Sequence, residues 1–305
     1  MKLFMAIAMA GILLAAIQPS SASTGDRELC LPLQVGKCRP LAKTGDKDLQ
    51  AALDSALDKN RSWRALIEEK KMAVGVVDLS DPADARFARV NGGTMMYAAS
   101  LPKIAVLLAA CQCFEDGVLK ETPQVHEDLV QMIRRSNNLA ASRMIDLIGL
   151  KSIEAVLEDR RYHFYDREEG GGIWIGARYA RGGERNPEPV KGLSHAATVT
   201  QICRFYYMLT NGEIISPERS REMLEILSKP DLHDKFVSVI EKHVSPERLF
   251  RKSGEWNIFF SDSVLVWDDG WRKYILTALI EDEDGEHILR DLVPVVEQIL
   301  SCPRG

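Results

Sequence analysis

A serine followed three residues later by a lysine opens a nearly all-apolar stretch of the chain. Ser100 and Lys103 lie in the segment from 97 to 110, which reads YAASLPKIAVLLAA. Positions three apart share a helix face, so the spacing predicts that the Ser100 hydroxyl and the Lys103 ammonium lie side by side. A desolvated lysine beside a hydroxyl can activate a serine nucleophile. The pair alone is a weak signal, because ordinary Ser and Lys usage gives about one such match in a chain of this length.

Two further polar motifs follow in the chain. Ser-Asn-Asn at 136–138 interrupts two predicted helices, and Lys-Ser-Gly at 252–254 ends a predicted strand. Each motif has an ordinary structural explanation by itself, as a helix cap, a snorkelling lysine or a turn. A literal Lys-Thr-Gly at 43–45 is discounted, because it precedes the serine and leads into a helix. The order and placement of the three motifs favour a shared catalytic site.

Hydrophobic periodicity predicts the elements that must position these motifs. An amphipathic helix begins at about residue 48, and the closing helix spans 286–300. Between them we expect strands at 72–79, 86–90, 249–253, 258–267 and 274–280, and helices at 100–115, 124–135, 139–148, 151–160, 196–209 and onward from 216 to about 243. A long polar segment from 165 to 194 has no clear period and is expected to be a functional loop. This order predicts an α+β fold: one antiparallel sheet built from both chain ends, with an all-α insertion.

The three ordered motifs resemble those of the serine β-lactamases and penicillin-binding proteins. Residues 74–103 are similar to the hairpin and nucleophile helix of the class A β-lactamases, and residues 132–141 to their Ser-Asp-Asn turn. The resemblance implies a β-lactamase/transpeptidase-like fold, in which an antiparallel sheet is flanked by N- and C-terminal helices and carries an inserted all-α subdomain. We therefore expect a single catalytic domain at 48–302 after an N-terminal extension at 23–47. Its α/β part would comprise 48–98 and 246–302, and its all-α part 99–245.

The resemblance also implies catalytic roles. Ser100 would attack an amide or lactam carbonyl to give an acyl-enzyme, and Lys103 would accept the Ser100 proton directly or through water. Ser136 would relay a proton to the leaving nitrogen. The backbone N–H groups of Ser100 and Glu255 would form the oxyanion hole.

The same resemblance implies a substrate-binding set on the second and third motifs. The Asn138 amide suits an amide of the substrate side chain, because it offers both donors and an acceptor. Lys252 would bind a substrate carboxylate and Ser253 would add a hydroxyl, while Gly254 and Glu255 complete this side of the site.

Several positions depart from the class A pattern. The loop glutamate that activates the hydrolytic water normally stands in Glu-x-x-Leu-Asn, which is missing between 165 and 194. Glu169 is the candidate base, with Glu168, Glu255 or no base as alternatives, and a solvated loop acid as the simpler interpretation. Asn137 replaces the usual aspartate. Glu255 stands where small or hydroxyl side chains are usual, and it could repel an anionic substrate or serve as a base.

Three other residues have open interpretations. His195 could contact the cleft or be a surface or capping histidine. Trp174 and Tyr179 could form a ligand wall or simply fix the glycine-rich loop. Ser100 and Ser136 are 36 positions apart (136 − 100), which is short for class A and predicts a more open cleft.

The start of the chain indicates export. An apolar run from Leu3 to Ile17, followed by small residues, predicts a cleaved signal peptide at 1–22, with an uncleaved anchor as the alternative. The protein would then be periplasmic or secreted, where disulfides can form. Of the six cysteines, Cys30 and Cys38 are the first candidates for a pair.

Composition excludes several classes of partner. The net charge is −5 and no basic cluster suggests nucleic acid. The scattered histidines and cysteines give no metal spacing, so we expect no metal or cofactor. After signal cleavage we expect no stable membrane insertion, because no later apolar stretch is long enough.

Three functions remain after these exclusions. The first is a β-lactamase of the class A type, which would confer antibiotic resistance. The second is a peptidoglycan D,D-peptidase or another amide or ester hydrolase, acting on a cell-wall peptide rather than a small β-lactam. The third is a penicillin-binding protein that is acylated without turnover.

Overall fold

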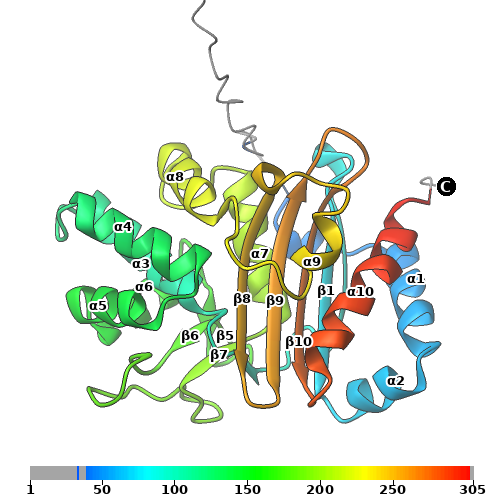
Figure 1. Cartoon of the computed structure of the whole chain (residues 1–305), viewed down its shortest axis with the longest axis horizontal. Helices are drawn as coiled ribbons and strands as arrows, with labels where there is room; N and C mark the ends of the chain where they lie inside the picture. The colour runs from blue at the N-terminus through cyan, green and yellow to red at the C-terminus, as the bar shows by residue number, and fades with distance from the viewer. Residues whose placement is uncertain (1–32, 34–38, 303–305) are drawn as a thin grey trace, which may run out of the picture.

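A five-stranded antiparallel sheet forms the centre of the molecule (Figure 1). The computed structural model describes residue 33 and residues 39–302. The strand order is β2-β1-β10-β9-β8, so strands from the two ends of the chain lie side by side. In the pairing of β1 with β10, Gly75 lies opposite Thr277. The strands are β1 Met72–Asp78, β2 Arg86–Val90, β8 Leu249–Trp256, β9 Phe259–Trp267 and β10 Lys273–Glu281.

One face of the sheet is covered by helices from the two chain ends (Figure 1). They are α1 Lys47–Asp58, α2 Arg61–Glu68, α10 Gly285–Leu300 and the short α9 Val237–Ile240. Asp46 caps α1 by accepting a hydrogen bond from the Leu49 amide at 2.7 Å. The leucines spaced four apart on α1 are buried against the sheet, as their period predicts.

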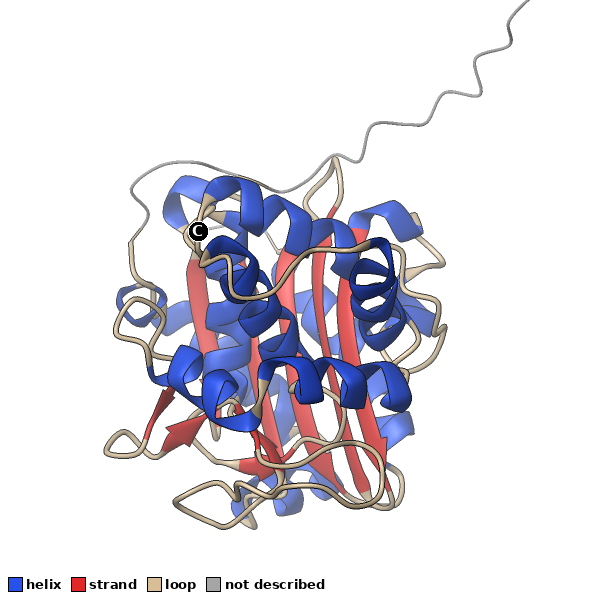
Figure 2. Cartoon of the chain, turned by 90° about the vertical axis from the view of Figure 1, so that its left-hand side faces the viewer, coloured by secondary structure: helices blue, strands red, loops and turns tan. Residues whose placement is uncertain are grey.

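The other face packs against α7 Val199–Thr210, which joins the sheet to a helical half. Figure 2 shows this half in front of the strands. Its helices are α3 Lys103–Glu115, α4 Pro123–Arg134, α5 Asn138–Ile148, α6 Leu150–Glu158 and α8 Pro217–Leu227. Helix α3 is buried from Lys103 to Gln112, so it forms the core of the helical half.

The polar segment after residue 164 contains short strands. β4 Tyr165–Asp166 pairs with β5 Gly171–Gly172. A second small sheet has the order β3-β7-β6, with β3 Met96–Tyr97, β6 Trp174–Ile175 and β7 His195–Ala197. Since β3 leads directly to Ser100, this small sheet connects the long segment to the nucleophile. The 3₁₀ turns are η1 Leu41–Lys43, η2 Pro82–Asp84 and η3 Pro246–Arg248.

The predicted α+β architecture is confirmed, and four local predictions are wrong. Helix α3 begins at Lys103, so Ser100 lies in the turn before it. Residues 195–197 form a strand rather than the start of a helix, because they pair with β3 and β6. Strand β8 continues to Trp256, and residues 228–236 are not helical.

Some predictions fall on residues that the structure does not describe. The signal peptide at 1–22 and the Cys30–Cys38 pair lie outside the described residues. Cys111, Cys113, Cys203 and Cys302 are free thiols. Within 39–302, every helix is too short or too polar to cross a membrane.

Candidate active site

The turn that carries Ser100 is held by hydrogen bonds to two strands. The Ala98 amide donates to the His195 carbonyl of β7 at 2.9 Å. The Ala98 carbonyl accepts the Ser261 hydroxyl of β9, also at 2.9 Å. Ala99 has a positive φ of 47°, a region that L residues rarely adopt. The surrounding contacts therefore maintain a strained backbone immediately before the nucleophile.

Strand β8 runs directly against this turn at Gly254. A β-carbon placed on Gly254 would lie 2.5 Å from the Ser100 nitrogen and 2.6 Å from the Ala98 carbonyl oxygen. Only glycine permits this approach. The close contact places the next backbone N–H on the strand, that of Glu255, at the edge of the Ser100 turn, where the resemblance locates the oxyanion hole.

Lys103 projects from the start of α3 into a polar cluster. Its Nζ donates to the Ser136 carbonyl at 2.6 Å, the Asn138 Oδ1 at 2.7 Å and the Ser136 Oγ at 3.3 Å. Burial lowers the pKa of Lys103 to about 7. A neutral amine can keep its two shorter hydrogen bonds and still offer its lone pair to a hydroxyl proton. In the described part of the chain no hydrogen bond joins Lys103 to the Ser100 hydroxyl, so the predicted pairing is not formed directly.

Lys252 approaches the same hydroxyl from β8. Its Nζ donates to the Ser136 Oγ at 2.9 Å and to the Ser253 carbonyl at 2.5 Å. Burial, and then the positive charge of Lys103, hold the pKa of Lys252 well below its usual range. The Ser136 hydroxyl therefore lies between two buried amines, a position suited to proton relay.

The second motif is positioned by a helix start. Ser136 has a positive φ of 54° just after α4 ends. Asn137 then caps α5, because its Oδ1 accepts the amides of Leu139 at 2.9 Å and Ala140 at 3.0 Å. Asparagine and aspartate cap helices equally well, so the departure from the family pattern at Asn137 preserves the turn.

Tyr179, for which the sequence left open a ligand wall or a residue that fixes the glycine-rich loop, contacts the turn before Ser100. Its hydroxyl donates to the Ala99 carbonyl at 3.1 Å, and its ring lies 4.3 Å from the Lys103 Nζ. The ring also packs on His195, with centroids 4.2 Å apart. Tyr179 thus contacts both the turn before Ser100 and the Lys103 ammonium group.

His195 contacts this cluster through the ring of Tyr179. The ring is buried, and its Nε2 lies 3.1 Å from the Ala177 carbonyl oxygen. Burial lowers the pKa of His195 to about 4, so the ring is neutral at physiological pH. The surface interpretation of His195 is wrong. Trp174, by contrast, is fully buried and fixes the long segment through its Nε1 bond to the Asn186 carbonyl at 2.7 Å.

Comparisons with known proteins agree with this geometry. A family model described as the β-lactamase enzyme family matches residues 119–293, more than half of the chain. The chain belongs to the β-lactamase enzyme family. The match includes the second and third motifs and begins after Ser100, whose place rests on the geometry above.

Solved structures of this family share the fold at low sequence identity. The β-lactamase from Sphaerobacter thermophilus is 18% identical with a TM-score of 0.61, covering 84% of this chain and 99% of that one. PBP-A is 16% identical with a TM-score of 0.60, covering 87% and 98%. A PBP-A variant solved as an acyl-enzyme complex with penicillin G is 16% identical with a TM-score of 0.59, covering 83% and 96%. No curated protein matches the sequence.

The predicted loop base of this family member is not placed at the site. Glu168 and Glu169 are exposed in the turn between β4 and β5, where their amides donate to Asp166 Oδ1 at 2.8 and 3.4 Å. Another loop acid, Glu188, is buried and accepts the Val190 and Lys191 amides at 2.8 and 2.6 Å, so it has a structural role. Among the described residues, the long segment presents Tyr179 rather than a carboxylate to the lysine.

Glu255 is engaged elsewhere. Its Oε2 lies 2.5 Å from the Nζ of Lys235, a buried residue in the irregular segment after α8. A carboxylate oxygen that accepts a hydrogen bond from an ammonium is occupied by that contact. The alternative that Glu255 activates water is therefore not supported by this arrangement.

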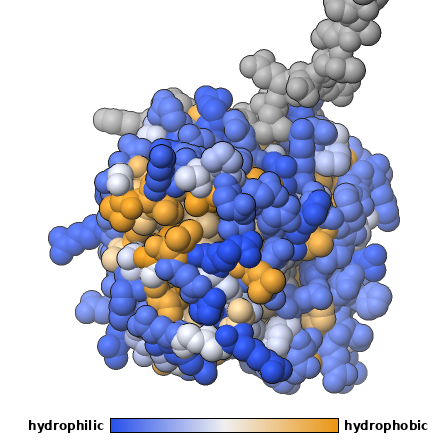
Figure 3. Space-filling model, turned by 60° about the vertical axis from the view of Figure 1, so that its left-hand side comes forward, coloured by the Kyte–Doolittle hydropathy of each residue, from blue (hydrophilic) through white to orange (hydrophobic). Residues whose placement is uncertain are grey.

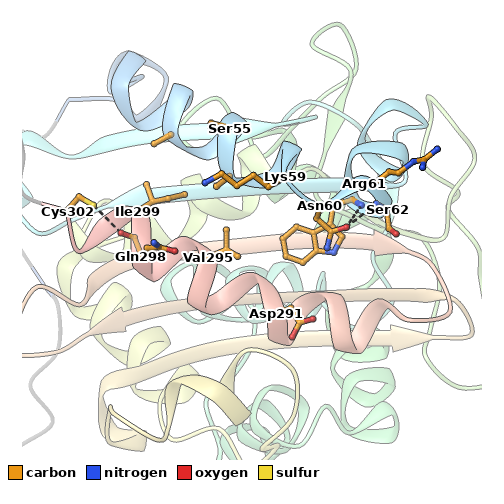
Figure 4. Close-up of a pocket in the computed structure, with 13 residues that line it drawn as sticks. Ser55, Lys59, Asn60, Arg61, Ser62, Asp291, Val295, Gln298, Ile299 and Cys302 are labelled. Carbon is orange, nitrogen blue, oxygen red and sulfur yellow. Dashed lines mark hydrogen bonds between the residues drawn. The ribbon is translucent and has the colours of Figure 1, made fainter.

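A large groove lies far from these motifs. It has a volume of about 940 Å³ and is formed between α1, the start of α2 and α10 (Figure 4). No residue of the three motifs lines it.

Part of the surface is apolar. Figure 3 shows apolar side chains gathered on one part of a mostly polar face. Leu139 and Leu147 of α5 are exposed. Across the described ranges, no group of three His, Cys, Asp or Glu side chains is arranged to hold a metal ion.

Proposed function

We propose that this protein is a serine hydrolase that forms an acyl-enzyme on Ser100, with a β-lactam amide as the first substrate class. The observation that carries the proposal is the buried Lys103, held by Ser136 and Asn138 beside the nucleophile turn, with its pKa lowered to about 7. A base of that pKa is matched to neutral pH.

The first half of the reaction follows from these contacts. Neutral Lys103 takes the proton of the Ser100 hydroxyl as its oxygen bonds to the carbonyl carbon. The backbone N–H groups of Ser100 and Glu255 stabilise the negative charge on the carbonyl oxygen. The carbon–nitrogen bond then breaks, and Ser136 gives its proton to the leaving nitrogen. Lys103, 3.3 Å away, returns a proton to the Ser136 oxygen.

Substrate binding uses the margins of the same cluster. Asn138 is exposed at the start of α5 and can bond the substrate side-chain amide with its amide N–H groups. Lys252 and Ser253 of β8 attract a substrate carboxylate. Both are nearly buried, which strengthens their electrostatic interaction with an anion that excludes water.

The second half of the reaction is hydrolysis of the acyl-enzyme, which needs a base that activates water. The loop gives no carboxylate at Lys103, and Glu255 is paired with Lys235. These observations favour slow hydrolysis of the acyl-enzyme, as in a D,D-peptidase or a protein that keeps penicillin bound. The similar PBP-A variant, which was solved as an acyl-enzyme with penicillin G, supports this second candidate.

We propose further that the mature protein acts outside the cytoplasm, where cell-wall peptides and β-lactams are found. The apolar N-terminal run and the family support this location. Sequencing the N-terminus of protein released from cells tests it, with a new terminus near residue 23 as the expected result.

Intact mass after mixing with excess benzylpenicillin tests the proposed chemistry. A transient adduct with accumulating penicilloate would establish a β-lactamase, and a persistent adduct a penicillin-binding or peptidase-like site. Ser100→Ala should form no adduct; an adduct on that variant would refute the nucleophile. Glu169→Gln tests whether Glu169 is the base that activates water. An adduct that lives longer than in the parent would establish this role, and an unchanged lifetime would exclude it.

A further inference from the structure

A chain of alternating charges extends from the interior to the edge of β8. Arg251 binds Asp234 at 2.5 Å and Asp262 at 2.8 Å. Lys235 binds Asp234 at 2.7 Å and Glu255 at 2.5 Å. Glu255 is the exposed end of this chain, with 60% of its side chain accessible, whereas Lys235 is 1% accessible.

Within this chain Lys235 has one replaceable partner. Asp234 is also held by the buried Arg251 guanidinium and stays in place when Lys235 changes partner. Burial opposes the charge on Lys235, but the hydrogen bonds that it donates to Asp234 and Glu255 raise its pKa overall, so it remains a cation. Glu255 touches it from the solvent side and can turn away into water, at the cost of its contact with Lys235.

Lys235 lies beside the part of β8 that the proposed function assigns to the substrate carboxylate, because its partner Glu255 stands two residues after Ser253 on that strand. The charge of Lys235 contributes to lowering the pKa of Lys252, after burial and the charges of Lys103 and Arg251. The Lys252 Nζ already donates to the Ser136 Oγ and the Ser253 carbonyl. Lys235 is buried beneath the exposed Glu255, so an arriving carboxylate can reach Lys235 only by taking the place of Glu255.

We propose that Glu255 is a specificity-determining residue, whose carboxylate holds the place on Lys235 that the carboxylate of an anionic substrate takes. Anionic substrates must displace Glu255 before they bind, whereas substrates neutral at this position need not. The ratio of the affinities for an acid and for its ester should thus be smaller in this protein than in one whose lysine at this position is free. This inference rests on the proposed function for the position of the substrate carboxylate.

The test compares an anion with its neutral ester in the absence of chemistry. In a Ser100→Ala background, the dissociation constants of benzylpenicillin and its methyl ester are measured by calorimetry, with and without Glu255→Gln. Loss of one charge-assisted contact corresponds to roughly tenfold in binding. We expect Glu255→Gln to strengthen benzylpenicillin binding roughly tenfold and to leave the ester within about twofold.

Asp231→Asn supplies the matched control. Asp231 is an exposed acid in the same segment, and it pairs with Arg135 at 2.7 Å rather than with Lys235. It should leave the acid-to-ester ratio unchanged. An equal effect of both substitutions would overturn the proposal in favour of general charge repulsion. An acid-to-ester ratio that Glu255→Gln leaves unchanged would also overturn it, as would a Glu255→Gln variant that binds neither probe.

The failure of the proposed function is seen separately. Intact mass of the protein with Ser100 present reports whether an acyl-enzyme forms. Absence of an adduct, together with the expected ratio change in the Ser100→Ala pair, would refute acyl transfer and leave the role of Glu255 standing.

Discussion

Replacing Gly254 by alanine should disable the nucleophile turn while leaving the fold largely intact. The added β-carbon would lie 2.5 Å from the Ser100 nitrogen, 2.6 Å from the Ala98 oxygen and 2.7 Å from the Leu101 nitrogen. Ordinary contacts are about 3.5 Å, so β8 and the turn must separate by up to about 1 Å. All three atoms belong to the backbone, so no side chain can rotate away.

The magnitude follows from what this separation disrupts. A misplacement of about 1 Å costs about a hundredfold in rate, and loss of one oxyanion donor costs about 100- to 1000-fold. Overpacking of this kind costs about 1–3 kcal/mol of stability. We therefore expect the acylation rate constant with benzylpenicillin, measured by intact mass, to fall at least about a hundredfold, with a lower unfolding temperature by circular dichroism.

Gly93→Ala is the matched control for this prediction. A β-carbon on Gly93 meets no atom within 4 Å, and the residue is exposed. Its acylation rate and unfolding temperature should equal those of the parent. If Gly254→Ala were acylated within about twofold of the parent rate, the close approach of β8 to Ser100 would not matter for catalysis, and the reasoning from the oxyanion hole would be refuted.

Three further predictions concern the groups around the nucleophile. Because burial lowers the pKa of Lys103 to about 7, this base is increasingly protonated as the pH falls below 7. The acylation rate should therefore drop about tenfold per pH unit below 7 and level off above about pH 8. A flat pH profile would exclude Lys103 as the base. Tyr179→Phe leaves the Ala99 carbonyl without its donor and should slow acylation roughly tenfold in stopped-flow measurements, whereas a parental rate would show that the hydroxyl does not position the turn. Asn137→Ala should lower the free energy of unfolding in urea by about 1 kcal/mol, while Asn137→Asp should retain it; equal loss in both would argue against the cap.

The motifs and the layout of the sheet could be predicted because their signals are local. The apolar run of β1 is continuous because this strand is buried on both faces, between the two hydrophobic layers. Ser100 and Ser136 lie at the ends of elements that periodicity identifies, whereas Lys252 lies inside β8, which is longer than predicted. The structure brings Ser136 and Lys252 together at 2.9 Å, as the order of the motifs indicated.

The remaining features depend on contacts that no local pattern encodes. Residues 195–197 include two alanines, which favour helix, but pairing with β3 and β6 makes them a strand. Tyr179 lies in a segment without periodicity, and its place depends on a bond to Ala99, far away in the chain. The partner of Glu255 is Lys235, which has a positive φ in an irregular segment. Such a backbone conformation has no sequence signal for lysine.

The contacts that hold the Ser100 turn also determine when in folding the protein becomes reactive. The turn is held by β7, β9 and Tyr179. The sheet forms only when β1 pairs with β10, the last strand in the sequence. Pairings this distant in sequence form late and slowly. A chain still being synthesised therefore lacks the contacts that hold the Ser100 turn. Labelling by a penicillin would report completed folding of the whole sheet rather than folding of the helical half alone.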